Sequence, residues 1–169
     1  HNRMSENRRV MAEQMKEISM DFFRDEVRNG FFIPTAVKQA WAAQLQVLDV
    51  IETICRKHDI TYFADWGTIL GTVRHGGYVP WDDDMDICMK REDYTRFKEA
   101  AKTELPKDFR IHDYEHQEDH WLFLSRVANS VHINFEPEHM KQFHNFPYIA
   151  GIDIFVLDYL YKDEQQEKQ

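Results

Sequence analysis

The stretch that decides the fold is residues 65–87, which read Asp-Trp-Gly-Thr-Ile-Leu-Gly-Thr-Val-Arg-His-Gly-Gly-Tyr-Val-Pro-Trp-Asp-Asp-Asp-Met-Asp-Ile. It ends in four carboxylates within five positions, Asp82, Asp83, Asp84 and Asp86. So many acids in one short segment, framed by Pro-Trp on one side and apolar residues on the other, are unusual for a solvated turn. Convergent acids of this kind mark functional sites.

The alternation of apolar and polar residues after these acids predicts a strand over 85–89, in which every second side chain lies on one face. Asp82, Asp84 and Asp86 would then share a face, and Asp83 would point the other way. Three carboxylates on one face repel each other unless a cation neutralises them. Hard oxygen ligands suit Mg²⁺ or Mn²⁺. We therefore predict a metal site rather than a solvated acidic turn.

The segment before the acids predicts a helix over 66–74, with Asp65 as N-cap and two consecutive glycines as its end. Gly67 and Thr68 would lie in the first turn, where free backbone N–H groups and the helix dipole favour an anion. Arg74 offers a guanidinium fork for phosphate oxygens. Phosphoryl transfer from a nucleotide needs an anion site and a divalent ion, so this helix is predicted to bind phosphate.

A structural role for the same helix is the alternative. Gly67 and Gly71 are four residues apart, and a helix with such spacing can lie close to a neighbouring strand. The acids that follow the helix favour the phosphate-binding interpretation over this one.

These residues resemble the signature of the LicD family, which includes bacterial phosphocholine transferases and is related to fukutin and fukutin-related proteins. A second block, Gly151 to Asp158, is similar to the family's later strand that carries another carboxylate, although Val156 stands where a proline is common. The resemblance spans residues 60–160, and family members usually continue beyond this point. The matching positions of the first block are Trp66-Gly67-Thr68, Gly71, Arg74-His75, Gly77, Pro80-Trp81-Asp82-Asp83-Asp84 and Asp86.

The resemblance implies a nucleotidyltransferase-like fold and transfer of a phospho-alcohol group from a nucleotide diphosphate donor to a sugar hydroxyl. CDP-choline is the expected donor. A cell-surface glycan or lipid-linked glycan, such as teichoic acid or lipopolysaccharide, is the expected acceptor. Trp66, Tyr78 and Trp81 are candidate walls for a quaternary ammonium group, which binds over aromatic faces. Ordinary core packing is the alternative for these three aromatic residues.

Asp153 lies in an otherwise apolar segment, 148–157, where an ionised carboxylate needs a cation or hydrogen-bond donors. We predict that it joins Asp84 and Asp86 as a metal ligand and helps to deprotonate the acceptor hydroxyl. This requires the strand 148–157 to lie beside the acidic strand, with the Asp153 and Asp86 carboxylates within about 6 Å. An aspartate facing water from an edge strand is the alternative.

Composition agrees with one domain of 169 residues, 43% hydrophobic and 30% charged. The net charge of −9 argues against general nucleic-acid binding. The sequence shows no bilayer-spanning run and no signal peptide, which predicts a cytoplasmic protein, with peripheral association at the inner face of the membrane as an option. Cys55 and Cys88 form no disulfide framework and are predicted to be buried.

The fold class predicted is α+β (or α/β-like), a mixed sheet flanked by helices. Residues 1–60 would form N-terminal helices on the core, 61–160 the catalytic core, and 161–169 a polar tail, in a chain that is C-terminally short relative to the family. Asp158 would cap a turn, and the His112/His116/His120 series would lie in a solvated loop. Helices are expected at 4–28, 35–58, 66–74, 93–105 and near 137–143, and strands at 61–64, 85–89, 110–114, 121–128 and 148–157.

Two other functions remain open on sequence grounds. A glycosyltransferase also holds Mn²⁺ and a sugar nucleotide with an Asp-x-Asp pair, but it would normally place a nucleotide-binding βαβ half before that pair. A non-catalytic or truncated module that binds metal and nucleotide without turnover is the other possibility.

Overall fold

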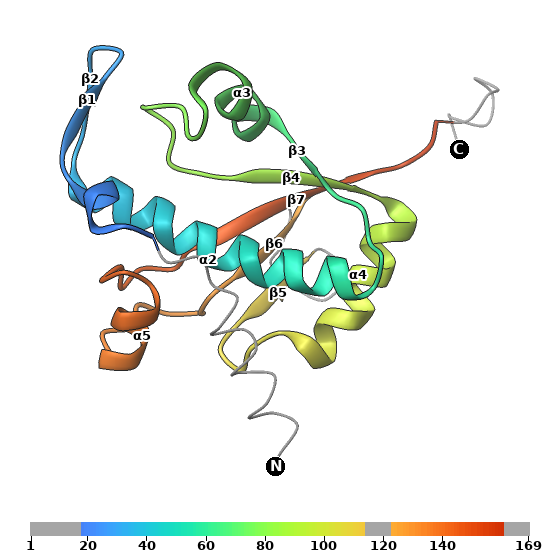
Figure 1. Ribbon diagram of the computed structural model, residues 1–169. Coiled ribbons are helices and arrows are strands. Elements are labelled where there is room, and N and C mark those ends of the chain that lie inside the picture. The colour runs from blue at the N-terminus through green and yellow to red at the C-terminus, as the bar shows by residue number, and fades with distance from the viewer. Residues whose placement is uncertain (1–17, 114–122, 161–169) are drawn as a thin grey trace.

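The structure is a computed structural model that describes residues 18–113 and 123–160, and its fold class is α+β, as predicted (Figure 1). The first 17 residues of the predicted N-terminal segment and the whole predicted polar tail, 161–169, therefore lie outside the described residues. In chain order the elements are the 3-10 helix η1 (Met20–Phe23), strands β1 (Glu26–Arg28) and β2 (Phe31–Ile33), helix α2 (Thr35–Lys57), β3 (Phe63–Ala64), α3 (Trp66–His75), β4 (Asp86–Lys90), α4 (Arg91–Glu104), β5 (Arg110–His112), β6 (Ser125–Ala128), α5 (Pro137–Gln142) and β7 (Gly151–Leu157).

The main sheet has five strands in the order β3-β4-β7-β6-β5. β4 and β7 are parallel, and the other neighbours are antiparallel, so the sheet is mixed. β7 is the central strand, and Ile152 and Ile154 are fully buried within it. The register pairs Asp86 with Asp153 directly, which confirms the predicted adjacency of the two acidic strands.

Helices α2 and α4 pack on the sheet and on each other (Figure 1). The buried residues Val47, Ile51 and Ile54 of α2 belong to the same hydrophobic cluster as Ile87 of β4 and Ile152 of β7. One apolar stripe of a long helix thus covers strands that come 30 to 100 residues later, roughly as helix amphipathicity requires. The hydrophobic core therefore contains residues from both predicted segments, 1–60 and 61–160. The boundary between these segments at residue 60 stays a prediction.

The predicted helix over 4–28 is wrong in its described part. Residues 1–17 lie outside the described residues, Met20–Phe23 form a single 3-10 turn, and Glu26–Arg28 pair with Phe31–Ile33 in a β-hairpin. Asn29 and Gly30 connect the strands with φ angles of 51° and 78°. Asn-Gly favours a two-residue hairpin turn in which both residues have positive φ, so this dipeptide starts a hairpin instead of merely ending a helix.

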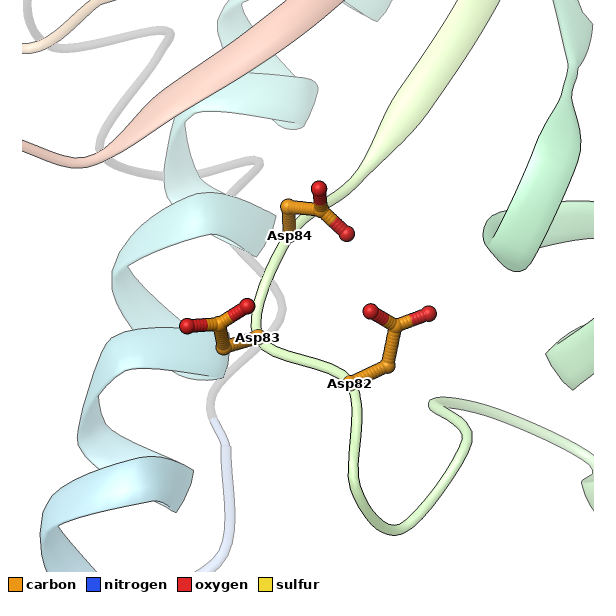
Figure 2. A group of neighbouring side chains, drawn as sticks. All are labelled: Asp82, Asp83 and Asp84. Atoms are coloured by element: carbon orange, nitrogen blue, oxygen red, sulfur yellow. The ribbon is translucent and has the colours of Figure 1, made fainter.

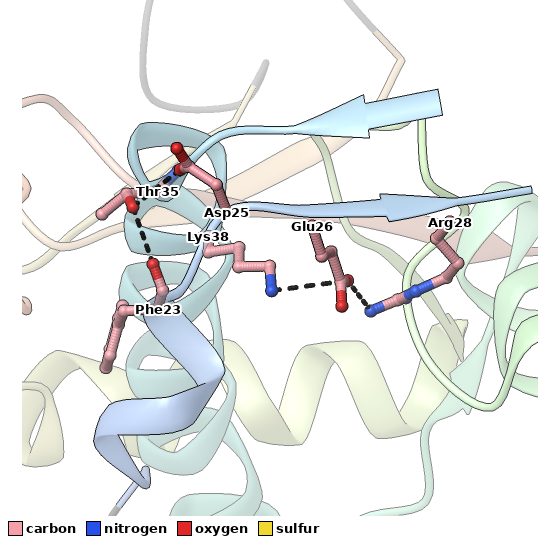
Figure 3. Close-up of polar contacts among 6 residues, drawn as sticks. All are labelled: Phe23, Asp25, Glu26, Arg28, Thr35 and Lys38. Carbon is pink, nitrogen blue, oxygen red and sulfur yellow. Dashed lines mark hydrogen bonds and ion pairs between the residues drawn. The ribbon is translucent and has the colours of Figure 1, made fainter. Parts of the chain in front are cut away.

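Polar contacts hold the hairpin to the start of α2 (Figure 3). The Thr35 backbone N–H donates to Asp25 Oδ1 at 2.6 Å, and the Thr35 hydroxyl donates to the Phe23 carbonyl at 2.7 Å. The Lys38 ammonium, almost fully buried, lies 3.4 Å from a carboxylate oxygen of Glu26. Asp25 thus supplies the cap that Pro34, at the N-cap position of α2, lacks.

Three smaller expectations also have an outcome. Cys55 and Cys88 are free and buried, as predicted. Asp158, predicted to cap a turn, accepts hydrogen bonds from Arg91 with both carboxylate oxygens, at 2.7 and 2.6 Å, a contact that the sequence did not predict. His112 lies in β5, and the other two histidines of its series lie outside the described residues.

Within 18–113 and 123–160, no helix has the length and hydropathy needed to cross a bilayer.

Candidate functional site

The acids at 82–84 lie in a loop between α3 and β4, because the strand begins only at Asp86. Strand alternation therefore does not separate Asp83 from its neighbours, and one carboxylate oxygen from each of Asp82, Asp83 and Asp84 lies within 4.8 Å of the others. In Figure 2 the Asp82 and Asp84 side chains reach toward a common space, and Asp83 is turned toward α2. Asp82 and Asp84 thus converge beside Asp86, but from a bent loop and not from one face of a strand.

Side chains of helix α2 fix the shape of this loop by binding its backbone carbonyl groups. The Trp41 indole N–H donates to the Asp82 carbonyl at 2.9 Å, and the Gln44 amide donates to the Asp83 carbonyl at 2.7 Å. Trp41 is 1% exposed, so the first of these bonds is anchored in the core. The loop that carries the carboxylates is therefore held in place by α2.

Asp86 and Asp153 lie side by side on β4 and β7, and each is about nine-tenths buried. Burial, together with the charges of Asp84 and Asp153, raises the pKa of Asp86 to about 6. Desolvation and the neighbouring Asp82 also raise the pKa of Asp84. Such shifts mean that the ionised carboxylates destabilise each other. A set of closely spaced carboxylate oxygens fits Mg²⁺ or Mn²⁺, which prefer hard ligands.

Arg126 on β6 is a site residue that the sequence reasoning missed. It pairs with Asp153 in the antiparallel register, and its guanidinium binds both carboxylate oxygens, with Nη2 donating to Oδ2 at 2.7 Å. The signal that could have found it is the one that found Asp153, a charged residue inside an apolar strand. The N-cap Asp65 was likewise not assigned to the site, although its charge contributes to the raised pKa of Asp86.

The first turn of α3 contacts the acids. The Thr68 hydroxyl accepts a hydrogen bond from the Asp86 backbone N–H at 2.8 Å. A Cβ on Gly67 would lie 2.3 Å from Asp82 Oδ2, so the absent side chain of Gly67 makes room for that carboxylate. Asp65 caps the helix through the Trp66 N–H, and Gly76 ends it with φ 67°, as predicted. The helix is thus as expected, and its first turn serves the acidic loop.

The structure does not bring Arg74 to this end of the helix. Arg74 lies seven residues after Gly67, which is roughly 10 Å along a helix axis, and its guanidinium lies 5.9 Å from the Trp81 ring centroid. Trp81 also contacts Phe31 of the hairpin and His75 edge-on. Trp66 is 65% exposed and adopts a positive φ of 41°, a strained conformation for a bulky residue.

A cavity of about 480 Å³ opens beside the acids and extends under α3 toward α2. Asp82, Asp84 and Thr68 line its polar end, and Trp41 and Tyr78 line its apolar part. These two rings are stacked, with centroids 4.7 Å apart, and the Tyr78 hydroxyl donates to Gln44 at 2.8 Å. Of the described aromatic residues that the sequence offered as ligand walls, Tyr78 alone lines this cavity, and Trp66 and Trp81 do not.

The fold and the gathered carboxylates define an α+β protein with a partly buried acidic site next to a cavity. The model of the family described as "LicD/FKTN/FKRP, nucleotidyltransferase domain" matches residues 59–167, and the chain belongs to this family. This confirms the resemblance found in the sequence.

Curated relatives match over a shorter stretch. The chain is 43% identical over 53 residues to the lipopolysaccharide cholinephosphotransferase LicD of Haemophilus influenzae, which covers 31% of this chain and 20% of that protein. It is 39% identical over 54 residues to an uncharacterised protein of Rickettsia typhi, covering 32% of this chain and 18% of the relative. The matches thus span about a fifth of the length of these relatives.

Proposed function

We propose that this chain carries the metal-binding core of a phosphotransferase that moves phosphocholine from CDP-choline onto a sugar hydroxyl of a cell-surface glycan. The observation that carries the proposal is the direct pairing of Asp86 with Asp153 on parallel strands, beside the acidic loop. Family membership and the name of the Haemophilus relative support the phosphocholine group and a lipopolysaccharide acceptor. Teichoic acid, a cytoplasmic location and a place at the inner face of the membrane belong to the same proposal.

The residue roles in this proposal follow the geometry. Asp84 and Asp86, with Asp82, hold one or two Mg²⁺ or Mn²⁺ ions, and Asp153 completes the ligand set. When bound, such an ion neutralises charge on the donor diphosphate. Asp153 accepts the proton of the acceptor hydroxyl, which requires that its oxygens leave Arg126.

The donor is placed against the polar end of the cavity. Thr68 and the backbone at Gly67 lie there beside Asp82 and Asp84. The aromatic lining at Tyr78 suits the quaternary ammonium or the base of the donor. Arg74 is not assigned to the donor phosphates, because it lies at the far end of α3 against Trp81.

The order of elements favours this function over a glycosyltransferase. Within the described residues, the elements that precede Asp84 are η1, the β1–β2 hairpin, α2, the short strand β3 and α3. β3 is antiparallel to β4, so these elements do not form a parallel βαβ half of the kind that binds a sugar nucleotide.

Transfer is tested by incubating the protein with CDP-choline, Mg²⁺ and lipopolysaccharide that lacks phosphocholine, and by measuring CMP release and choline incorporation. We expect turnover in the parent and in Glu99→Gln, which removes an exposed carboxylate from α4. Asp84→Asn and Asp86→Asn should reduce transfer at least a hundredfold. CDP-choline binding without any release of CMP would instead support the non-catalytic module.

A further inference from the structure

Arg126 is placed so that it can serve two partners at the site. Its side chain is half exposed, whereas the carboxylate of Asp153 is almost fully buried. The guanidinium therefore binds Asp153 with two of its N–H groups and still presents an edge to solvent. An Arg fork also matches the oxygens of a phosphate, and such contacts are the strong, charge-assisted kind.

The fold reserves space for this side chain at Gly151. A Cβ on Gly151 would lie 2.9 Å from Cδ and 3.0 Å from Cγ of Arg126. The arginine stem thus runs across the backbone of β7, two residues before Asp153, on its way to the carboxylate. This packing aims the guanidinium at the acids instead of leaving it free over the surface.

The charge around Arg126 comes from several carboxylates. The bond to Asp153 and the negative charges of Asp153, Asp84 and Asp86 raise the pKa of Arg126. The guanidinium therefore shares the acidic site with the residues assigned to the metal ion. Two cations that compete for one carboxylate repel each other, so an ion at Asp153 weakens the hold of that residue on Arg126.

We propose that Arg126 neutralises Asp153 in the metal-free protein and, once a divalent ion takes Asp153, binds a phosphate oxygen of the donor. This inference rests on the proposed function, and it assigns to Arg126 the phosphate contact that the sequence suggested for Arg74. The ligand class is a metal-bound diphosphate, and the residue acts by binding and positioning it.

The test uses Arg126→Gln, which removes the charge, and Arg126→Lys, which keeps it without the planar fork. Arg74→Gln is the matched control, since it removes a guanidinium from the last turn of α3, at the end of that helix away from the acids. Calorimetry measures Mn²⁺ binding first and then inorganic pyrophosphate binding to the Mn²⁺-loaded protein. Thermal unfolding with and without Mn²⁺ gives a second reading that needs no turnover.

Arg126→Gln should bind Mn²⁺ at least as tightly as the parent, show a larger Mn²⁺-induced rise in Tm, and bind pyrophosphate at least tenfold more weakly. Arg126→Lys should fall between the two, and Arg74→Gln should match the parent. The inference is overturned if Arg126→Gln, or Arg126→Lys where the glutamine variant does not fold, binds pyrophosphate like the parent. It is also overturned if Mn²⁺ affinity falls as far as in Asp86→Asn.

Failure of the proposed function has a different signature. If the parent binds Mn²⁺-pyrophosphate in an Arg126-dependent way but transfers no phosphocholine, the function fails and the role of Arg126 stands. If the parent transfers phosphocholine and the Arg126 variants bind pyrophosphate normally, the role of Arg126 fails and the function stands.

Discussion

Thr68 links the two halves of the site through one atom. Its hydroxyl oxygen accepts the backbone N–H of Asp86, which connects the first turn of α3 to the first residue of β4. A buried or half-buried N–H without an acceptor costs the desolvation of that group. The Thr68 hydroxyl therefore stabilises the start of β4, whose first residue, Asp86, is a proposed metal ligand.

Thr68→Val keeps the volume of the side chain but removes this acceptor, whereas Thr68→Ser keeps it. We expect Thr68→Val to lower the free energy of unfolding by about 1 to 2 kcal/mol and to weaken Mn²⁺ binding. Urea denaturation and calorimetry check both effects. Equal stability and equal Mn²⁺ affinity in the two variants would show that the hydrogen bond has no such role.

His139 offers a pH-dependent prediction away from the acids. It is buried on α5, its Nε2 has no hydrogen-bond partner within the described structure, and burial lowers its pKa below the usual value near 6.5. A histidine held neutral in the fold gains a proton on unfolding, so stability falls as the pH drops through 6.5 and below. His139→Gln stays neutral at every pH.

We expect the stability difference between His139→Gln and the parent to shift in favour of the variant between pH 7 and pH 5. Thermal unfolding at several pH values checks this, since the other histidines are the same in both proteins. A difference that does not change with pH would mean that His139 titrates alike in the folded and unfolded states.

Sequence reasoning identified the residues at this scale better than their contacts. It paired Asp86 with Asp153 on two grounds: a carboxylate in an apolar strand demands a partner, and the block 151–158 resembles the later acidic strand of the LicD family. It gave Gly67 to a phosphate, whereas the space beside Gly67 holds the Asp82 carboxylate. A glycine leaves space for a neighbouring group, but the sequence does not show whether a ligand or a side chain from another segment fills that space.

At the scale of elements, α3 lies against the loop that follows it. A Cβ on Gly71 would lie 2.3 Å from the Gly77 carbonyl oxygen and 3.0 Å from the Val79 backbone nitrogen. Both contacts are to backbone, so neither atom can move aside without shifting the loop that leads to the acids. The alternative interpretation of this helix was close packing on a neighbouring strand; Gly67 and Gly71 do allow a close approach, but to the loop before β4.

Gly71→Ala should lower the free energy of unfolding by about 2 kcal/mol or more, because the added methyl group meets backbone that cannot repack. Gly77→Ala is the matched control, since a Cβ there meets nothing within 4 Å. It should stay within about 0.5 kcal/mol of the parent. Urea denaturation measures both, and a Gly71→Ala protein as stable as Gly77→Ala would contradict the close packing.

Local signals predicted some elements well and others poorly. The limits of α3 followed from Asp65 and the glycine at its end, which act on neighbouring residues. The hairpin at 26–33 was missed, because the predicted helix was carried up to residue 28 and Asn29-Gly30 was interpreted as its end instead of as a hairpin turn. The start of β4 was predicted within one residue, but strand alternation was wrongly extended back to 82–84, where the loop is bent by bonds from α2, some 40 residues away.

At the scale of the whole molecule, carboxylates are concentrated at the N-terminal ends of β4 and β7 and in the loop before β4. Asp86 and Asp153 lie on the two parallel strands of the sheet, next to the carboxylates of the acidic loop. Their mutual repulsion is a cost that the rest of the fold offsets in the absence of a cation. The proposed function and the stability of the metal-free protein therefore oppose each other at this site.

Asp86→Asn should raise the free energy of unfolding of the metal-free protein by about 1 kcal/mol, less than the full pKa shift implies, because water screens part of the repulsion. It should also abolish the Mn²⁺-induced rise in Tm that mass action gives the parent. Scans with EDTA and with Mn²⁺ check both, with Glu99→Gln as control. A variant that is less stable than the parent and still responds to Mn²⁺ would contradict the account.

The central place of β7 has a consequence for synthesis on the ribosome. Asp153 follows Asp86 by 67 residues, which is roughly 3 to 13 s at ordinary rates of translation. Throughout that interval β4 lacks its parallel neighbour, and the acidic loop lacks Asp153. The sheet and the acidic site of the nascent chain are thus incomplete at the same time, and the insertion of β7 completes both.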